Sequence, residues 1–220
     1  GNALRGLIQI QILPKELAFM TKYKTILEKY LPGSSVDIIY DWLRKYNIHL
    51  KVSRKRSTKL GDYRPPQKGK GHQITVNYDL NQYAFLITLV HEIAHLVVFE
   101  NHGNRVKAHG KEWKESYREL MKPFLEMQLF PDDIDEALRS YLAKSYASSG
   151  SDLSLSRVLQ KYDDEQGLTL EMLDEGSIFQ LPNGKTFKKG PLVRKRYRCV
   201  NVDTKRIYLV NPLAKVEIRS

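Results

Sequence analysis

Cysteine is almost absent from this sequence, with Cys199 standing alone among 220 residues. A single cysteine excludes a disulfide within the chain and a four-cysteine zinc site, and it fits a reducing compartment. The alternating apolar stretch from Leu4 to Leu13 lacks the basic flank and cleavage site of a secretory signal. The richest apolar run, from Phe85 to Phe99, is interrupted by ionisable residues and falls short of the roughly 20 residues of a membrane span. We therefore expect a cytoplasmic protein with no membrane partner.

Acidic residues are outnumbered by basic ones, and the basic excess is unevenly distributed. The formal net charge is +11 at pH 7, which favours anionic partners, nucleic acid above all. Residues 51–71 carry eight basic side chains and one acidic one, and residues 185–220 carry eleven and two. Residues 132–175, in contrast, carry four basic and eleven acidic side chains. Two basic regions on either side of an acidic connector indicate more than one domain.

The predicted secondary structure places the chain in the α+β class. Hydrophobic periodicity and end signals predict helices at 16–30, 35–46, about 81–101, 110–125 and 132–145, with Asp79 or Asn81 as the cap of the third. Strands are predicted at 48–52, 73–76, 178–181, 186–187, 193–202, 207–210 and 215–218. A Ser/Gly-rich linker is predicted at 148–156, and Asn183-Gly184 predicts a hairpin turn. We expect a helical domain with a small antiparallel sheet, followed by a small all-β domain.

The long apolar helix carries the pattern His-Glu-x-x-His at residues 91–95. His91 and His95 are four residues apart, so both imidazoles lie on one helix face, close enough to share a metal ion. Glu92 projects toward the open position of that metal, where it is expected to act as general base on a water molecule. Burying these side chains is costly unless a partner such as a metal ion compensates. The alternative is a pair of hydrogen-bonded structural histidines.

A catalytic zinc ion usually has three protein ligands, so the pattern at 91–95 is incomplete by itself. The position six residues after His95 is Asn101, which excludes the spacing of the metzincins. The residues leave several candidates open: His102, His109, Glu100, Glu112 and Glu115.

The stretch from His109 to Trp113, His-Gly-Lys-Glu-Trp, narrows this choice. Together with residues 91–95 it resembles the SprT-like metallopeptidases, the family that includes bacterial SprT and eukaryotic Spartan. In that family the third metal ligand is the histidine of a His-Gly-x-x-aromatic motif, and His109 lies fourteen residues after the second histidine. The resemblance therefore implies Zn²⁺ held by His91, His95 and His109, with Glu92 as the catalytic residue. His102 is then expected to be a helix-end histidine.

The resemblance covers roughly residues 13–126 and carries expectations about domains and function. It implies a SprT-like metallopeptidase domain at 1–130. The charge distribution and the strand signals then predict an acidic helical connector at 131–176 and a small basic β domain at 177–220. The implied activity is that of a zinc metalloendopeptidase acting on protein, which in the Spartan branch is protein trapped covalently on DNA, a DNA-repair substrate. Many members have a C-terminal zinc ribbon, and this tail lacks its Cys-x-x-Cys pairs. The alternative is a DNA-binding protein with a structural or idle metal site; the oligomeric state is left open.

Two basic segments are candidates for contact with DNA. The first precedes the strand expected to border the active site and comprises Arg54, Lys55, Arg56 and Lys59, with Arg64 close by. The second is expected to line one face of the strand 193–202 and comprises Arg194, Arg196 and Arg198, with Tyr197 or Tyr208 available for base stacking. Such contacts would be made to the DNA phosphate backbone and would not distinguish between base sequences. Their strength would depend strongly on salt concentration. The alternatives are a solvated loop, a solvated sheet face, and an acidic connector that competes with DNA for a basic patch.

Aromatic residues around the motif also carry expectations. Trp113 and Tyr117 are predicted to pack between the two histidine-bearing helices. Tyr63 and Tyr78 are candidates for stabilising the oxyanion of the reaction. Cys199 is predicted to be a packed strand residue.

Overall fold

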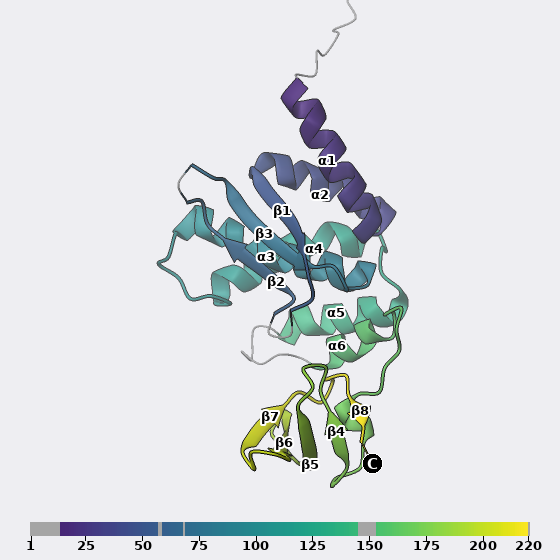
Figure 1. The fold of residues 1–220 in the computed structure, drawn as a ribbon. Coiled ribbons are helices and arrows are strands. Elements are labelled where there is room, and N and C mark those ends of the chain that lie inside the picture. Colours follow the sequence, from purple (N-terminus) through teal and green to yellow (C-terminus); the bar gives the residue numbers. More distant parts are fainter. Residues whose placement is uncertain (1–13, 57–58, 68, 145–152, 220) are drawn as a thin grey trace, which may run out of the picture. The chain divides into compact units, whose positions relative to one another are not determined.

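The computed structural model describes residues 14–56, 59–67, 69–144 and 153–219 (Figure 1). The chain divides into two compact units, residues 1–135 with 142–147 and residues 136–141 with 148–220. Both units contain helices and a sheet, which makes the fold α+β as expected.

The first unit follows the predicted element order with two additions, the short helix η1 and the strand β2. Its elements are α1 (Pro14–Tyr30), η1 (Gly33–Ser35), α2 (Val36–Lys45), β1 (Ile48–Ser53), β2 (Gly61–Arg64), β3 (His72–Asn77), α3 (Gln82–His102), α4 (Lys111–Glu126) and the first part of α5 (Asp132–Lys144). Helix α4 continues through Pro123, so that residue does not end the helix.

The sheet of the first unit is mixed, which corrects the expectation of a small antiparallel sheet. The strand order is β1-β3-β2; β1 runs parallel to β3, with Ile48 opposite His72, and β2 runs antiparallel to it, with Gly61 opposite Val76. Strand β2 was not predicted because its four residues, Gly-Asp-Tyr-Arg, have no apolar alternation. Strand β2 pairs with one side of β3, and β1 pairs with the other side.

Helix α3 is the central element of this unit and packs against β2, β3 and α4. The side chain of Asn81 caps its start by accepting hydrogen bonds from the backbone N–H groups of Tyr83 and Ala84. Gly103, with φ 59°, ends it. By length and composition α3 would suffice to cross a membrane, so the expectation that no apolar run reaches that length is wrong. Within the unit 67% of that stretch is buried, which accounts for its apolar sequence.

The second unit is a five-stranded antiparallel sheet with helical additions. Its elements are α6 (Leu153–Gln160), η2 (Leu170–Met172), β4 (Ile178–Gln180), β5 (Thr186–Val193), β6 (Arg196–Asn201), β7 (Ile207–Val210) and β8 (Glu217–Ile218), in the sheet order β7-β6-β5-β4-β8. Residues 177–220 contain the strands β4 to β8, as predicted for the small β domain, and α6 and η2 precede them in the predicted helical connector. Helix α6 also occupies the end of the predicted linker, whose residues 148–152 lie outside the described residues. Cys199 is buried in the core with Phe179 and Phe187, as predicted.

The predicted strand 193–202 is in fact the end of β5, a tight turn and β6. Val193 pairs with Arg196, so Arg194 and Lys195 form the turn, and Arg194 has a left-handed backbone with φ 58°. Two-residue hairpin turns usually contain glycine or asparagine, and this one has neither. The sequence therefore gave no signal for the turn.

Candidate metal centre and active site

Three histidine side chains from two segments of the first unit converge on one point. The Nε2 atom of His109 lies 3.0 Å from Nε2 of His95 and 3.0 Å from Nε2 of His91. His91 and His95 come from adjacent turns of α3, and His109 comes from the loop before α4. Among the described residues, this is the group of potential ligand side chains close enough to bind a metal ion.

The turn at His109 and Gly110 brings the third histidine into this cluster. His109 has a left-handed backbone with φ 56°, a conformation that is uncommon outside glycine and often found at functional sites. Gly110 is the N-cap of α4, and its N–H donates to the carbonyl of Lys107 at 2.9 Å. A Cβ atom at Gly110 would lie 2.9 Å from that same carbonyl oxygen. The glycine of the His-Gly pair is thus required by the close approach of the turn.

Trp113 forms a wall behind the three imidazoles. Its ring centroid lies 4.5 Å from that of His91, 5.4 Å from that of His95 and 4.7 Å from that of His109. Tyr117, one turn further along α4, stacks on the indole at 4.9 Å. Both aromatic residues are buried between α3 and α4, which confirms the prediction that they pack between these helices. The aromatic of the His-Gly-x-x-Trp motif therefore fixes the orientation of the histidine rings.

The environment keeps these histidines neutral at pH 7. Burial, with the neighbouring imidazoles, lowers the pKa of His91 to about 3. Burial and His109 lower the pKa of His95 to about 4, and burial lowers the pKa of His109. Neutral imidazole nitrogens are the form that binds metal ions.

The spacing of the three nitrogens fits zinc. Ligand nitrogens about 2.0–2.1 Å from a tetrahedral zinc ion would lie roughly 3.3 Å apart. The two Nε2–Nε2 distances of 3.0 Å are close to that value. With the proton of each neutral ring on Nδ1, the three Nε2 atoms offer their lone pairs to the point where they converge. A cation at the point of convergence would satisfy them.

Glu92 lies beside this cluster and is held by strand β2. Its side chain is buried, with 7% of the residue exposed, although it carries an ionisable group. The backbone N–H of Tyr63 donates a hydrogen bond to the carboxylate. Burial and the nearby Asp62 raise the pKa of Glu92 to about 7, against the opposing effects of Lys59, Arg56 and that N–H group. The carboxyl group is thus poised to exchange a proton near neutral pH.

The approach of β2 to Glu92 depends on Gly61. A Cβ atom at Gly61 would lie 2.6 Å from Oε1 and 2.8 Å from Cγ of Glu92, and 2.8 Å from Cγ2 of Thr88. No side chain other than hydrogen fits there without displacing Glu92 or the strand. Neither Gly61 nor the backbone of Tyr63 was expected from the sequence, because the strand that carries them was not predicted.

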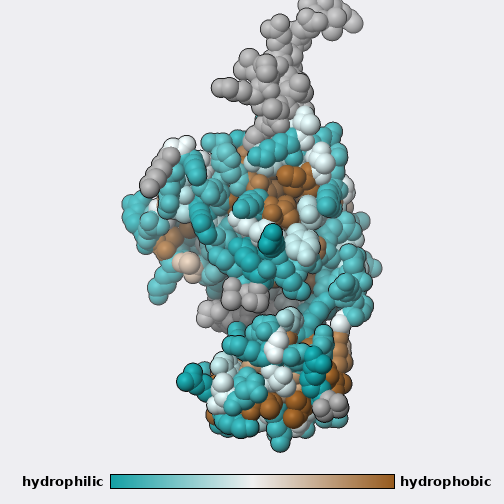
Figure 2. All heavy atoms as spheres, viewed as in Figure 1, coloured by the Kyte–Doolittle hydropathy of each residue, from teal (hydrophilic) through white to brown (hydrophobic). Residues whose placement is uncertain are grey.

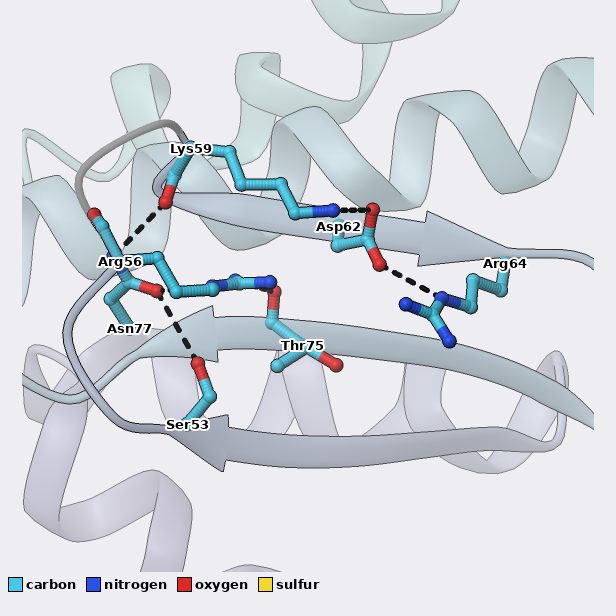
Figure 3. Close-up of polar contacts among 7 residues, drawn as sticks. All are labelled: Ser53, Arg56, Lys59, Asp62, Arg64, Thr75 and Asn77. Atoms are coloured by element: carbon cyan, nitrogen blue, oxygen red, sulfur yellow. Dashed lines mark hydrogen bonds and ion pairs between the residues drawn. The ribbon is translucent and has the colours of Figure 1, made fainter.

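Asn77, which is 1% exposed, holds two residues that precede β2, Arg56 and Lys59 (Figure 3). Its amide nitrogen donates to the carbonyls of Arg56 and Lys59, and its Oδ1 accepts from Nε of Arg56 at 2.8 Å. In β2, Asp62 pairs with Nζ of Lys59 at 2.6 Å and with Nε of Arg64 at 2.9 Å. These contacts set the course of the chain toward Gly61.

Most of the first basic segment is therefore engaged in the fold. Arg56 is held by Asn77, Lys59 pairs with Asp62, and Lys55 pairs with Asp79 at 3.4 Å. Arg54 is exposed. In the second unit Arg196 and Arg198 are exposed on β6, whereas Arg194 lies in the turn before it. The expectation of three arginines along one strand is thus wrong, because the strand begins only at Arg196.

The hydroxyl of Tyr63 is engaged on the sheet rather than free for a substrate. It lies 3.0 Å from Nδ1 of His72, whose Nε2 lies 3.0 Å from a carboxylate oxygen of Glu100. Burial and the charge of Glu100 raise the pKa of Tyr63. Tyr78, the other tyrosine considered for the oxyanion, is largely exposed. His102 ends α3 and is not part of the histidine cluster.

Comparison with protein families gives a match to the SprT-like family over residues 33–133. This part of the chain belongs to the SprT-like family. The SprT-like region runs from η1 to the start of α5 and contains the histidine cluster, Glu92 and β2. Comparisons with curated proteins and with solved structures gave no match. Membership in this family indicates a metallopeptidase-like function.

Proposed function

We propose that the SprT-like region is a zinc metalloendopeptidase. The observation that carries the proposal is the convergence of three neutral Nε2 atoms beside a buried carboxyl group. His91, His95 and His109 would hold the zinc ion. When bound, zinc supplies Lewis acidity, which acidifies a water molecule and polarises a peptide carbonyl group.

Glu92 is the group that moves the proton in this proposal. As a carboxylate it takes a proton from the attacking water, and it then gives that proton to the nitrogen of the departing amine, so it ends the cycle as it began. Its pKa of about 7 suits both steps near neutral pH. The N–H of Tyr63 and the close approach of Gly61 keep the carboxylate oriented. Trp113 shields the histidines from water on the other side.

We further propose that the substrate is protein in a DNA context, such as a DNA–protein crosslink. The net charge of +11 and the exposed Arg54, Arg196 and Arg198 support attraction to a phosphate backbone. Because Arg56 and Lys59 also hold the loop before β2, we expect them to contribute through the fold as well as through charge. DNA binding of this kind would weaken steeply as salt is raised.

The test uses the full chain and a protein crosslinked to a DNA oligonucleotide. Glu92→Gln should retain zinc and DNA binding but lose cleavage, because the amide cannot accept the proton. His109→Ala should lose most of its zinc by elemental analysis. Cleavage that persists in Glu92→Gln would refute the assigned role. Zinc absent from the wild type, even after titration, would favour the alternative of a DNA-binding protein with an idle metal site.

A further inference from the structure

Strand β1 is the second edge of the sheet in the first unit. In the order β1-β3-β2, β3 is the only neighbour of β1 among the described residues, and β2 is the opposite edge, which contacts Glu92. Alternate backbone groups of β1 therefore point away from the sheet. Among the described residues, His49, Leu50, Lys51 and Val52 make no backbone hydrogen bond outside the sheet. An open edge of this kind is able to pair with another extended chain.

The open edge lies in a groove between α1 and β1 with a volume of about 590 Å³. The four consecutive residues 49–52 all line it, together with Gln73 and Thr75 of the neighbouring strand β3, so the groove extends from the edge of β1 onto one face of the sheet. The other wall consists of residues of α1 from Lys22 to Tyr30. The groove thus follows four consecutive residues of β1 and is bounded by α1.

The chemistry of the groove combines an apolar floor with a cationic rim. Ile26, Leu50 and Val52 belong to the floor, and Figure 2 shows an apolar patch ringed by hydrophilic residues on the face between α1 and β1. The rim carries three lysines and no acidic residue among those that line it: Lys22, Lys29 and Lys51. None of these three lysines forms an ion pair with a described residue.

We propose that this groove binds an extended acidic segment of a partner protein, which adds to the sheet alongside β1. Its backbone would pair with the N–H and C=O groups of β1 that point away from β3. Its apolar side chains would contact Ile26 and Leu50, and its carboxylates would face the rim lysines. The site is an exosite, since β1 and the strand that holds Glu92 are opposite edges of the sheet. It depends on the fold of the first unit and does not require zinc or cleavage.

A single-stranded nucleic acid suits this groove less well than a peptide. Base binding without sequence preference relies on exposed aromatic faces. Tyr23 is only 2% exposed, and Tyr30 is stacked on Phe85 with ring centroids 5.1 Å apart. The ammonium groups of Lys22 and Lys29 also lie over these two tyrosine rings, at 5.1 and 5.2 Å from their centroids. An unpaired strand edge, in contrast, is a specific partner for a peptide backbone.

The proposal is tested with a fluorescein-labelled peptide of alternating glutamate and valine, matched to the six residues of β1. The full chain carrying Glu92→Gln is used so that the probe is not cleaved, and binding is followed by anisotropy. We expect saturable binding that falls about tenfold in the double variant Lys29→Glu/Lys51→Glu. Lys24→Glu is the matched control, because Lys24 is on α1 outside the groove and pairs with Glu28; it should change binding less than about twofold.

Two further probes separate strand addition from simple charge attraction. A peptide N-methylated at alternate amides keeps its charge but cannot pair with a strand, and it should bind about tenfold more weakly. Bound peptide should also slow hydrogen exchange in residues 48–53. Equal effects of Lys24→Glu and of the double variant, or equal binding of the N-methylated peptide, would overturn the proposal. Displacement of the peptide from residues 48–53 by oligothymidylate at lower concentration would assign the groove to nucleic acid instead.

Discussion

Replacing Gly61 by alanine tests whether strand β2 holds the general base in position. The added Cβ atom would lie 2.6 Å from Oε1 of Glu92 and 2.8 Å from Cγ2 of Thr88. Ordinary carbon contacts begin at about 3.5 Å, so Glu92 or the strand must move by somewhat less than an ångström. A displacement of about 1 Å at a reacting group lowers a rate roughly 100-fold. We therefore expect kcat to fall about that much, with overpacking costing about 1–3 kcal/mol of stability.

The assay compares Gly61→Ala with Gly33→Ala, which adds the same methyl group where no atom lies within 4 Å. Cleavage rate, zinc content and thermal unfolding are measured for both variants. Zinc should be retained in Gly61→Ala, because the three histidines come from α3 and the loop before α4. A Gly61→Ala enzyme with kcat within twofold of wild type would refute the idea that this contact positions Glu92. Loss of zinc together with activity would show that the damage extends beyond β2.

Three other substitutions have expected outcomes. Trp113→Ala should cost about 3–5 kcal/mol in urea unfolding and weaken zinc retention against a chelator, because it removes the buried wall behind the histidines. Asn77→Ala should cost about 1–3 kcal/mol and speed hydrogen exchange in residues 59–64, because two partly buried backbone carbonyls lose their donor. Arg157 lowers the pKa of Glu171, so this pair stabilises the fold above the ordinary glutamate pKa of about 4.3, and the contribution is lost as pH falls through the lowered value. Glu171→Gln should therefore cost less than about 1 kcal/mol at pH 7, a difference that disappears in acid.

A specific experimental result would contradict each of these three predictions. Zinc held as tightly by Trp113→Ala as by Trp113→Phe would mean that the ring wall does not orient the ligands. Unchanged exchange in residues 59–64 of Asn77→Ala would mean that the loop is fixed by other contacts. A stability difference for Glu171→Gln that is as large at pH 2 as at pH 7 would mean that the ion pair is not its source.

The histidine-bearing helix could be predicted from the sequence because its signals are local. The four-residue spacing of His91 and His95 fixes their common face, and the cap at Asn81 and stop at Gly103 follow from side-chain and backbone chemistry near the helix ends. His109 is different: the residues alone left five candidates for a third ligand, and only the resemblance selected it. The left-handed turn that carries His109 has no periodicity from which it could have been inferred.

The part of the site contributed by the sheet could not be predicted, because it depends on contacts between distant residues. The strand that holds Glu92 is short and polar, and its place beside α3 follows from its pairing with β3. The parallel pairing of β1 with β3 likewise has no local signature in an alternating pattern. In the second unit, the turn at Arg194 lacks the glycine or asparagine that would have marked it. The distribution of charge located the basic segments. It could not show that Arg56 is hydrogen-bonded to Asn77 or that Lys59 is paired with Asp62.

Two of the three histidines lie on a helix and the third lies on a loop. Metal affinity therefore depends on how well ordered the loop between α3 and α4 is. His91 and His95 are presented by a capped, buried helix, whereas His109 depends on a strained turn fourteen residues further along the chain. An ion bound by all three would close that loop and remove conformational entropy from it, as a crosslink would. Any change that loosens the turn would therefore speed release of the ion without altering α3. The rate of metal release would then report how well ordered the segment between α3 and α4 is.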